Sequence, residues 1–284
     1  MSVWEPWDAD DGELADLRVV RERIPDTMRP ALLEWLYNRL HGSYSSTSAV
    51  LVNGLQSALR ISLGFDRGTV NTGALVDVIE ARGDKTLLRV ADWLIGQFER
   101  DPYTGTPQEV AELEWHLDTA MSGVRVASVG RGFRLALRLP EGVEEALQIA
   151  VDKGPRIAGQ HLAKALRQVQ SLDPDTSAAM TEAIRAVEAA AGPVVLPKDK
   201  RLQLSKIVQS LKDKPTWTLG LQRRDDGIPD HQAVLIGMME TLAFAQQDRH
   251  AGEAPTIQEA MAHAMLAATL VGWFSTGVVH MNER

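Results

Sequence analysis

The stretch Ala245-Gln-Gln-Asp-Arg-His-Ala-Gly-Glu-Ala-Pro-Thr-Ile-Gln-Glu259 joins two strongly apolar segments and decides how the C-terminal half is interpreted. Before it, residues 230–247 place apolar side chains three and four apart, as on the buried face of a helix: Val234, Leu235, Met238, Met239 and Leu242. At its end, Thr256-Ile-Gln-Glu259 is a capping box, the sequence pattern that starts a new helix. The quoted stretch is therefore predicted to be a loop between two helices, and Arg249 and His250 lie on it.

Three further segments accompany this loop in a recognisable order. They are the helical run Thr181–Ala190 followed by Pro193-Val-Val-Leu-Pro197, a short helix Leu202–Leu211, and Gln246–Gly252 before a final helix that ends in Leu270–Gly277. In this pattern residues 174–284 resemble the abortive-infection C-terminal domain, a branch of the HEPN superfamily, and especially its prophage-borne or defence-associated actinobacterial members. The resemblance implies a C-terminal HEPN-like helical bundle over residues 173–284 and a role in abortive infection or phage defence.

The resemblance also implies a site. HEPN ribonucleases hold an Arg and a His in a cleft at a dimer interface, and the matching residues here are Arg249 and His250, which are adjacent where the family separates them by four to six residues. Metal-independent RNA cleavage needs a base and a fixed cation, which these two side chains supply. Neighbouring helical residues point about 100° apart, so an Arg of one chain would have to pair with a His of another across a two-fold axis. The alternative is that both residues cap the carbonyl end of the preceding helix.

Composition limits the classes of function. With 284 residues the chain is long enough for two domains, and a hydrophobic content of 44% is that of a globular protein. It has no cysteine, which removes disulfides and thiolate metal sites. A net charge of −8 argues against a general nucleic-acid binder. No phosphate-binding loop, dinucleotide fingerprint, nucleophile elbow or paired metal ligands occur, so neither a metal nor a cofactor is expected.

The N-terminal half, residues 1–140, is predicted to be a helical domain that ends in a β-hairpin. Thr106-Pro-Gln-Glu109 indicates a helix start with a capping box. Val124–Val129 and Phe133–Leu139 then alternate apolar and polar residues around a glycine turn and are the only strands expected. Four cations lie on or around this hairpin: Arg125, Arg131, Arg134 and Arg138. They would either contact phosphates, as in a nucleic-acid-binding regulator, or protect an exposed ribbon from edge pairing.

Residues 141–172 are expected to form a helix that links the halves, either continuous or broken at Gly154-Pro155. His161 lies on it without a second His or a carboxylate four residues further on, so it is interpreted as a packed or partly exposed helical histidine and not as a ligand. Thr216–Leu221 and the residues after it are expected to form an irregular connection inside the bundle.

The start of the chain lacks a basic segment followed by an apolar run, so a cytoplasmic location is expected. Ala260–Met281 holds no acidic or basic side chain, apart from His263 and His280, and is long enough to span a bilayer. Its alanine content and glycines favour the centre of a helical bundle instead, so no membrane contact is expected. The segment offers more apolar surface than one helix in a small bundle can bury, which further predicts a homodimer through the C-terminal half.

Taken together, the sequence predicts an all-α protein with one small hairpin. The favoured function is an interaction or sensing module with a phage or host protein as partner. The alternatives are an endoribonuclease, whose partner is RNA, and a nucleic-acid-binding regulator.

Overall fold

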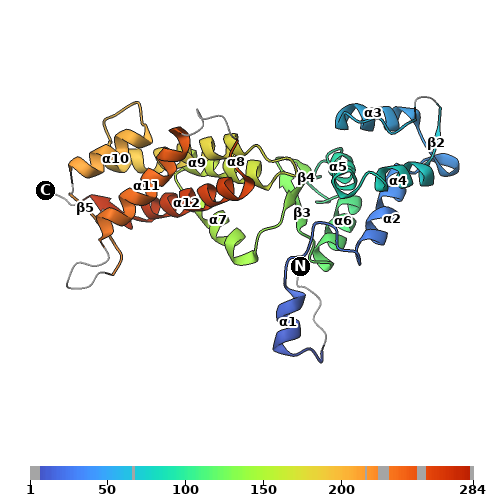
Figure 1. Ribbon diagram of the computed structural model, residues 1–284, viewed down its shortest axis with the longest axis horizontal. Coiled ribbons are helices and arrows are strands. Elements are labelled where there is room, and N and C mark those ends of the chain that lie inside the picture. Colours follow the sequence, from blue (N-terminus) through green and yellow to red (C-terminus); the bar gives the residue numbers. More distant parts are fainter. Residues whose placement is uncertain (1–6, 66–67, 215, 223–229, 248–253, 282–284) are drawn as a thin grey trace. The chain divides into compact units, whose positions relative to one another are not determined.

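The computed structural model describes residues 7–65, 68–214, 216–222, 230–247 and 254–281. The chain divides into two compact units, Met1–Leu139 and Pro140–Arg284 (Figure 1). Helices make up 61% of the described residues and strands 10%, which confirms a mainly helical protein with far less strand than a mixed fold contains.

The first unit is a set of short helices followed by a hairpin. Its elements are α1 (Asp11–Leu17), α2 (Arg29–Leu40), η1 (Ser43–Ser45), β1 (Ser46–Thr47), α3 (Ala49–Leu59), β2 (Val70–Asn71), α4 (Thr72–Glu80), α5 (Asp84–Ile95), α6 (Gln108–Thr119), β3 (Val124–Val129) and β4 (Gly132–Leu137). Helix α5 is central, since it packs on α3, α4 and β4. Its buried apolar residues recur at helical spacing: Leu87, Leu88, Val90, Ala91, Leu94 and Ile95.

The predicted hairpin is confirmed. β3 and β4 pair antiparallel, with Val124 opposite Leu137 and Val129 opposite Gly132, around Gly130 in the left-handed region at φ 64°. The strands alternate as expected, because Val124, Val126, Phe133 and Leu135 are buried. This face rests on α5 and α6, which gives the first unit its second layer.

The second unit is a helical bundle. Its elements are α7 (Glu141–Lys153), α8 (Arg156–Gln170), α9 (Thr176–Val195), α10 (Leu204–Asp213), β5 (Trp217–Leu219), α11 (His231–Gln247), α12 (Ile257–Thr276) and β6 (Val279–Met281). The capping box that starts α12 is present, since Thr256 Oγ1 accepts from the Glu259 amide at 3.1 Å and the Glu259 carboxylate accepts from the Thr256 amide at 2.7 Å. Helix α12 ends at Gly277, whose φ of 76° suits glycine.

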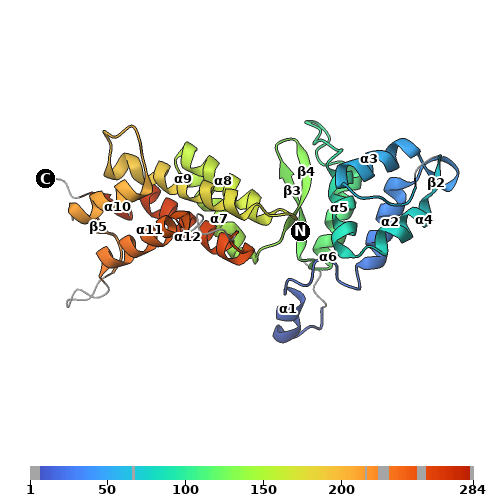
Figure 2. The ribbon, with the colours of Figure 1, turned by 45° about the horizontal axis from the view of Figure 1, so that its top comes forward.

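Small side chains bring the central helices together. α8 and α9 run side by side (Figures 1 and 2), and α12 packs against both. Alanines supply much of the buried surface of α9 and α12: Ala179, Ala183, Ala186, Ala190, Ala191, Ala260, Ala264, Ala267 and Ala268. Residues 141–172, expected to link the halves, form two helices broken at Gly154-Pro155, and both pack inside the second unit.

Two sequence-based expectations about local structure are wrong. Strands occur outside the predicted hairpin: β5 pairs with β6 through Trp217 and Met281, and β1 pairs with β2. Helix α6 has no side-chain cap, because Pro107 occupies the N-cap position and the Glu109 carboxylate forms an ion pair with Arg39 at 3.2 Å instead.

The apolar segment from residue 260 onward lies inside the bundle as α12, and among the described residues no helix is long and apolar enough to cross a bilayer.

Candidate functional site

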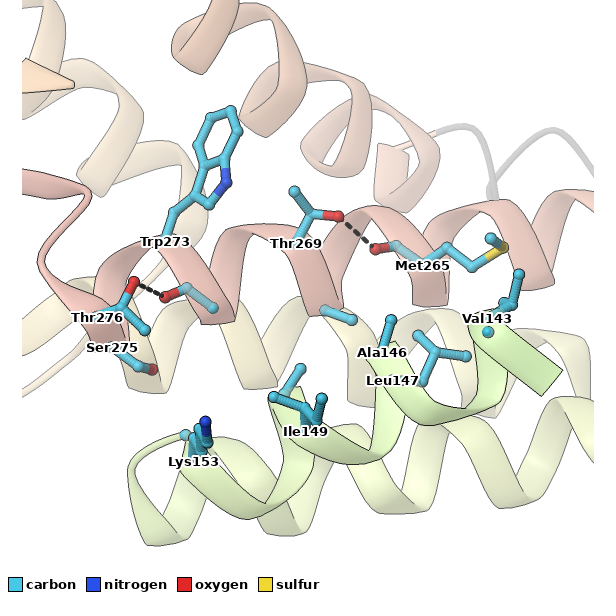
Figure 3. Close-up of a pocket in the computed structure, with 15 residues that line it drawn as sticks. Val143, Ala146, Leu147, Ile149, Lys153, Met265, Thr269, Trp273, Ser275 and Thr276 are labelled. Atoms are coloured by element: carbon cyan, nitrogen blue, oxygen red, sulfur yellow. Dashed lines mark hydrogen bonds between the residues drawn. The ribbon is translucent and has the colours of Figure 1, made fainter. Parts of the chain in front are cut away.

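A groove of about 450 Å³ runs along the second unit between α7 and α12 (Figure 3). One wall belongs to α7 and its C-cap: Gly142, Val143, Ala146, Leu147, Ile149, Ala150, Lys153 and Gly154. The other wall belongs to α12: Met265, Ala268, Thr269, Gly272, Trp273, Ser275 and Thr276. The side chains of Ile149 and Met265 are 45% and 38% exposed, so apolar surface at this groove remains in contact with water.

The spacing of small residues on α12 creates the space. Ala268, Gly272 and Ser275 recur every three or four positions and therefore line one side of the helix, in register with Met265. A Cβ atom placed on Gly272 would meet nothing within 4 Å, so this position leaves real room beside the helix. Thr269 and Trp273 rise from the side of α12 away from α7 in Figure 3.

The hydroxyl groups of the groove already donate to their own helix. Thr269 Oγ1 donates to the Met265 carbonyl at 3.1 Å, Ser275 Oγ to Val271 at 2.6 Å, and Thr276 Oγ1 to Gly272 at 2.8 Å. Such bonds to the carbonyl four residues earlier satisfy the hydroxyl proton within the helix. The groove therefore offers an essentially alkyl surface despite its three hydroxyl residues.

Among the described residues, Lys153 is the one charged side chain that lines the groove. It occupies the last turn of α7 and lies at the same end as Ser275 and Thr276 (Figure 3). It forms no ion pair with any residue in the described ranges of the chain. An ammonium group is thus available at one end of an apolar channel.

A second polar cluster joins α8 to α9. His161 Nδ1 lies 2.6 Å from Glu182 Oε2, and Arg185 Nη1 donates to Glu182 Oε1 at 2.8 Å. One turn further on, the Glu188 carboxylate accepts the backbone N–H of Leu204 at 2.8 Å and so caps the start of α10. His161 is a partly exposed helical histidine, which is one of the two forms expected, but its carboxylate partner comes from another helix and was not visible in the local sequence.

The two carboxylates have opposite electrostatic environments. Burial raises the pKa of Glu182, but the hydrogen bonds from His161 and Arg185 outweigh it and hold the pKa below its ordinary value. At Glu188 burial dominates and raises the pKa, although the Leu204 amide opposes it. A carboxyl group whose pKa is lowered by folding stabilises the fold at pH values above its unfolded-state pKa, and this stability is lost as the pH falls through the folded-state pKa. A carboxyl group whose pKa is raised favours the fold below its unfolded-state pKa, and this stability is lost as the pH rises through the folded-state pKa.

Replacing these two residues with glutamine is therefore expected to have effects of opposite sign. Glu182→Gln should destabilise the protein by roughly 1 kcal/mol at neutral pH, and this loss should become smaller only when the pH falls below the ordinary glutamate pKa of about 4.3 toward the lowered pKa of the folded state. Glu188→Gln keeps an acceptor for Leu204 and removes the disfavoured charge, so its melting temperature at neutral pH should equal or exceed that of the wild type. That advantage should shrink on acidification, when the wild-type carboxyl is protonated. Melting curves between about pH 3 and pH 7 test both, and a loss of stability in Glu188→Gln at neutral pH would contradict the assignment.

Three of the hairpin arginines form ion pairs within the first unit. Arg134 pairs with Asp92 and Arg138 with Asp118, each at 2.5 Å, and Arg131 lies 3.5 Å from Glu99. Arg125 lies on β3 opposite Ala136. The positive charges of the three paired arginines are offset by carboxylates, and nucleic-acid binding through this hairpin stays a prediction.

Arg249 and His250 lie outside the described residues. The helices before and after them, α11 and α12, are both present where the sequence predicted them. Among the described residues no three His, Cys, Asp or Glu side chains are grouped so as to hold a metal ion.

Comparison of the chain with protein-family models, with curated proteins and with solved structures finds no match.

Proposed function

We propose that the protein is an interaction or sensing module whose second unit binds an apolar ligand in the groove between α7 and α12. The observation that carries this proposal is the groove itself. Its volume of about 450 Å³ falls in the usual range of roughly 300 to 1,000 Å³ for small-molecule sites. Apart from Lys153 and Trp273, the described residues that line it have mainly alkyl, small or hydroxyl side chains, and none of them is a carboxylate or a histidine, which favours binding over acid–base catalysis.

The driving force is burial of apolar surface. Each Å² of apolar surface removed from water contributes about 25 cal/mol of favourable free energy. A ligand that covers the exposed parts of Ile149 and Met265 gains this contribution on both walls at once. Because the groove is already formed, little ordering of the protein opposes binding.

Gly272→Leu is expected to abolish binding of the neutral fluorescent probe phenylnaphthylamine, with at least a tenfold loss of affinity. The new side chain would occupy the groove, because a Cβ at this position meets open space. The fold should tolerate it, since leucine is preferred over glycine in a helix by about 1 kcal/mol. Probe fluorescence measured against protein concentration gives the affinity, and thermal melting checks the fold.

Gly237→Leu is the matched control. Gly237 lies on α11, does not line the groove, and a Cβ there also meets nothing within 4 Å. It should bind the probe as the wild type does. Equal probe binding by wild type and Gly272→Leu, or no binding by wild type, would overturn the proposal.

The biological setting rests on the sequence resemblance. We infer that the sensing serves abortive infection or phage defence, with a phage or host protein as partner and a homodimer as the assembled state. Endoribonuclease activity through Arg249 and His250 remains the alternative prediction.

A further inference from the structure

We propose that the ligand of the groove is a free alkyl carboxylate, with its chain along α12 and its anionic head at Lys153. This inference rests on the proposed function and adds the chemical class of the ligand. Two properties of the groove carry it, namely the length of its apolar lining along α12 and the position of Lys153, the one charged side chain among the described residues that line it.

The dimensions of the groove fit an alkyl chain. The lining residues of α12 run from Met265 to Thr276, a length of about 17 Å at about 1.5 Å per residue. Its volume of about 450 Å³ lies in the range of roughly 300 to 1,000 Å³ that is usual for small-molecule sites. An unbranched alkyl chain laid along α12 matches this length.

The charge selects the head group. Lys153 ends the α7 wall, and no described residue neutralises it by an ion pair. Its neighbour Asp152 accepts a hydrogen bond from Gln148 at 2.9 Å and does not line the groove. The groove hydroxyls donate to helix carbonyls, so Ser275 and Thr276 do not compete with the ammonium for an anion. A carboxylate at the end of the alkyl chain would meet the ammonium where the apolar wall stops.

The dependence of affinity on the length of the alkyl chain tests whether the chain lies in the groove. Each buried methylene contributes about 0.8 kcal/mol, so two additional methylenes should tighten the dissociation constant by about tenfold until the groove is full. Octanoate and decanoate are compared by displacement of phenylnaphthylamine from the full-length protein. Equal affinity for the two would overturn the placement of the chain in the groove.

The charge is tested by comparing decanoate with the neutral decanol on the same protein. The measured quantity is the ratio of the decanol to the decanoate dissociation constant. Lys153→Met should lower this ratio about fivefold to tenfold, as loss of one partly exposed charged contact predicts. Lys153→Arg keeps the charge and should retain the ratio. Lys200→Met, which removes a lysine outside the groove lining, is the charge-matched control and should also retain it.

The outcomes separate the two proposals. If the probe binds and both amphiphiles displace it with a ratio insensitive to Lys153→Met, the carboxylate assignment is overturned and the apolar site stands. The same holds if Lys200→Met lowers the ratio as much as Lys153→Met does, or if the probe binds and neither amphiphile displaces it. If the probe itself does not bind the wild type, the proposed function fails together with this inference.

Discussion

Replacing Asp92 with alanine is expected to lower the free energy of unfolding of the first unit by about 3 kcal/mol. Its carboxylate, only 11% exposed, accepts from Arg134 Nε at 3.0 Å, from Arg134 Nη2 at 2.5 Å and from the buried Leu135 amide at 2.7 Å. Alanine leaves that amide without an acceptor, which costs about 1 to 3 kcal/mol, and removes a charge-assisted pair between α5 and β4. Because the Arg134 side chain is 61% exposed, the pair itself contributes less than a fully buried one.

Urea unfolding followed by tryptophan fluorescence measures this loss, since five of the seven tryptophans belong to the first unit. The control is Glu99→Ala, which breaks the pair with Arg131 in which both side chains are 68% exposed. It should change stability by less than about 0.5 kcal/mol. Similar small losses in both variants would show that Asp92 does not hold the hairpin to α5.

Gly159→Ala is expected to destabilise the second unit by about 2 kcal/mol and to weaken binding in the groove. A Cβ at Gly159 would lie 2.3 Å from the Val151 carbonyl oxygen, so α7 and α8 must separate to admit it. Overpacking of this kind costs about 1 to 3 kcal/mol, and the better helix propensity of alanine offsets only part of it. Since α7 forms one wall of the groove, its displacement should reduce the affinity for phenylnaphthylamine.

Gly192→Ala separates a backbone clash from a side-chain clash. Its Cβ would also come within 2.3 Å of a neighbour, but that neighbour is the flexible end of the Leu202 side chain. Leu202 can turn aside, so the loss should stay below about 1 kcal/mol. Far-UV circular dichroism melting compares the two variants. An equal loss in both would mean that the approach of α7 to α8 is not a backbone constraint.

Local signals were sufficient for much of the fold. The capping box at Thr256 and Glu259, the alternation of the hairpin and the break at Gly154-Pro155 each depend on residues within one turn or one pair of strands. The same kind of signal was wrong at Thr106, because Arg39, far away in sequence, takes the carboxylate that the local pattern assigned to a cap.

The parts that the sequence did not reveal depend on contacts between distant segments. β5 and β6 have three residues each and lie about sixty positions apart. Each strand is too short to show the alternation of apolar and polar residues, and their separation hides the pairing. His161 meets Glu182 from the next helix, and Lys153 becomes distinctive only when α7 lies beside α12. The groove belongs to no single segment, so no local pattern indicates it.

The placement of α12 has a thermodynamic consequence. This helix lines the groove on one side, packs on α7, α8, α9 and α11, and leads into β6. By mass action, a ligand that binds only the folded state adds binding free energy to the folding stability of the unit that contains the site. Because α12 contributes buried residues to the core of the second unit, a ligand in the groove would stabilise the whole bundle and not α12 alone. The first unit has its own core. A bound ligand would thus raise the stability of the second unit without adding to that of the first.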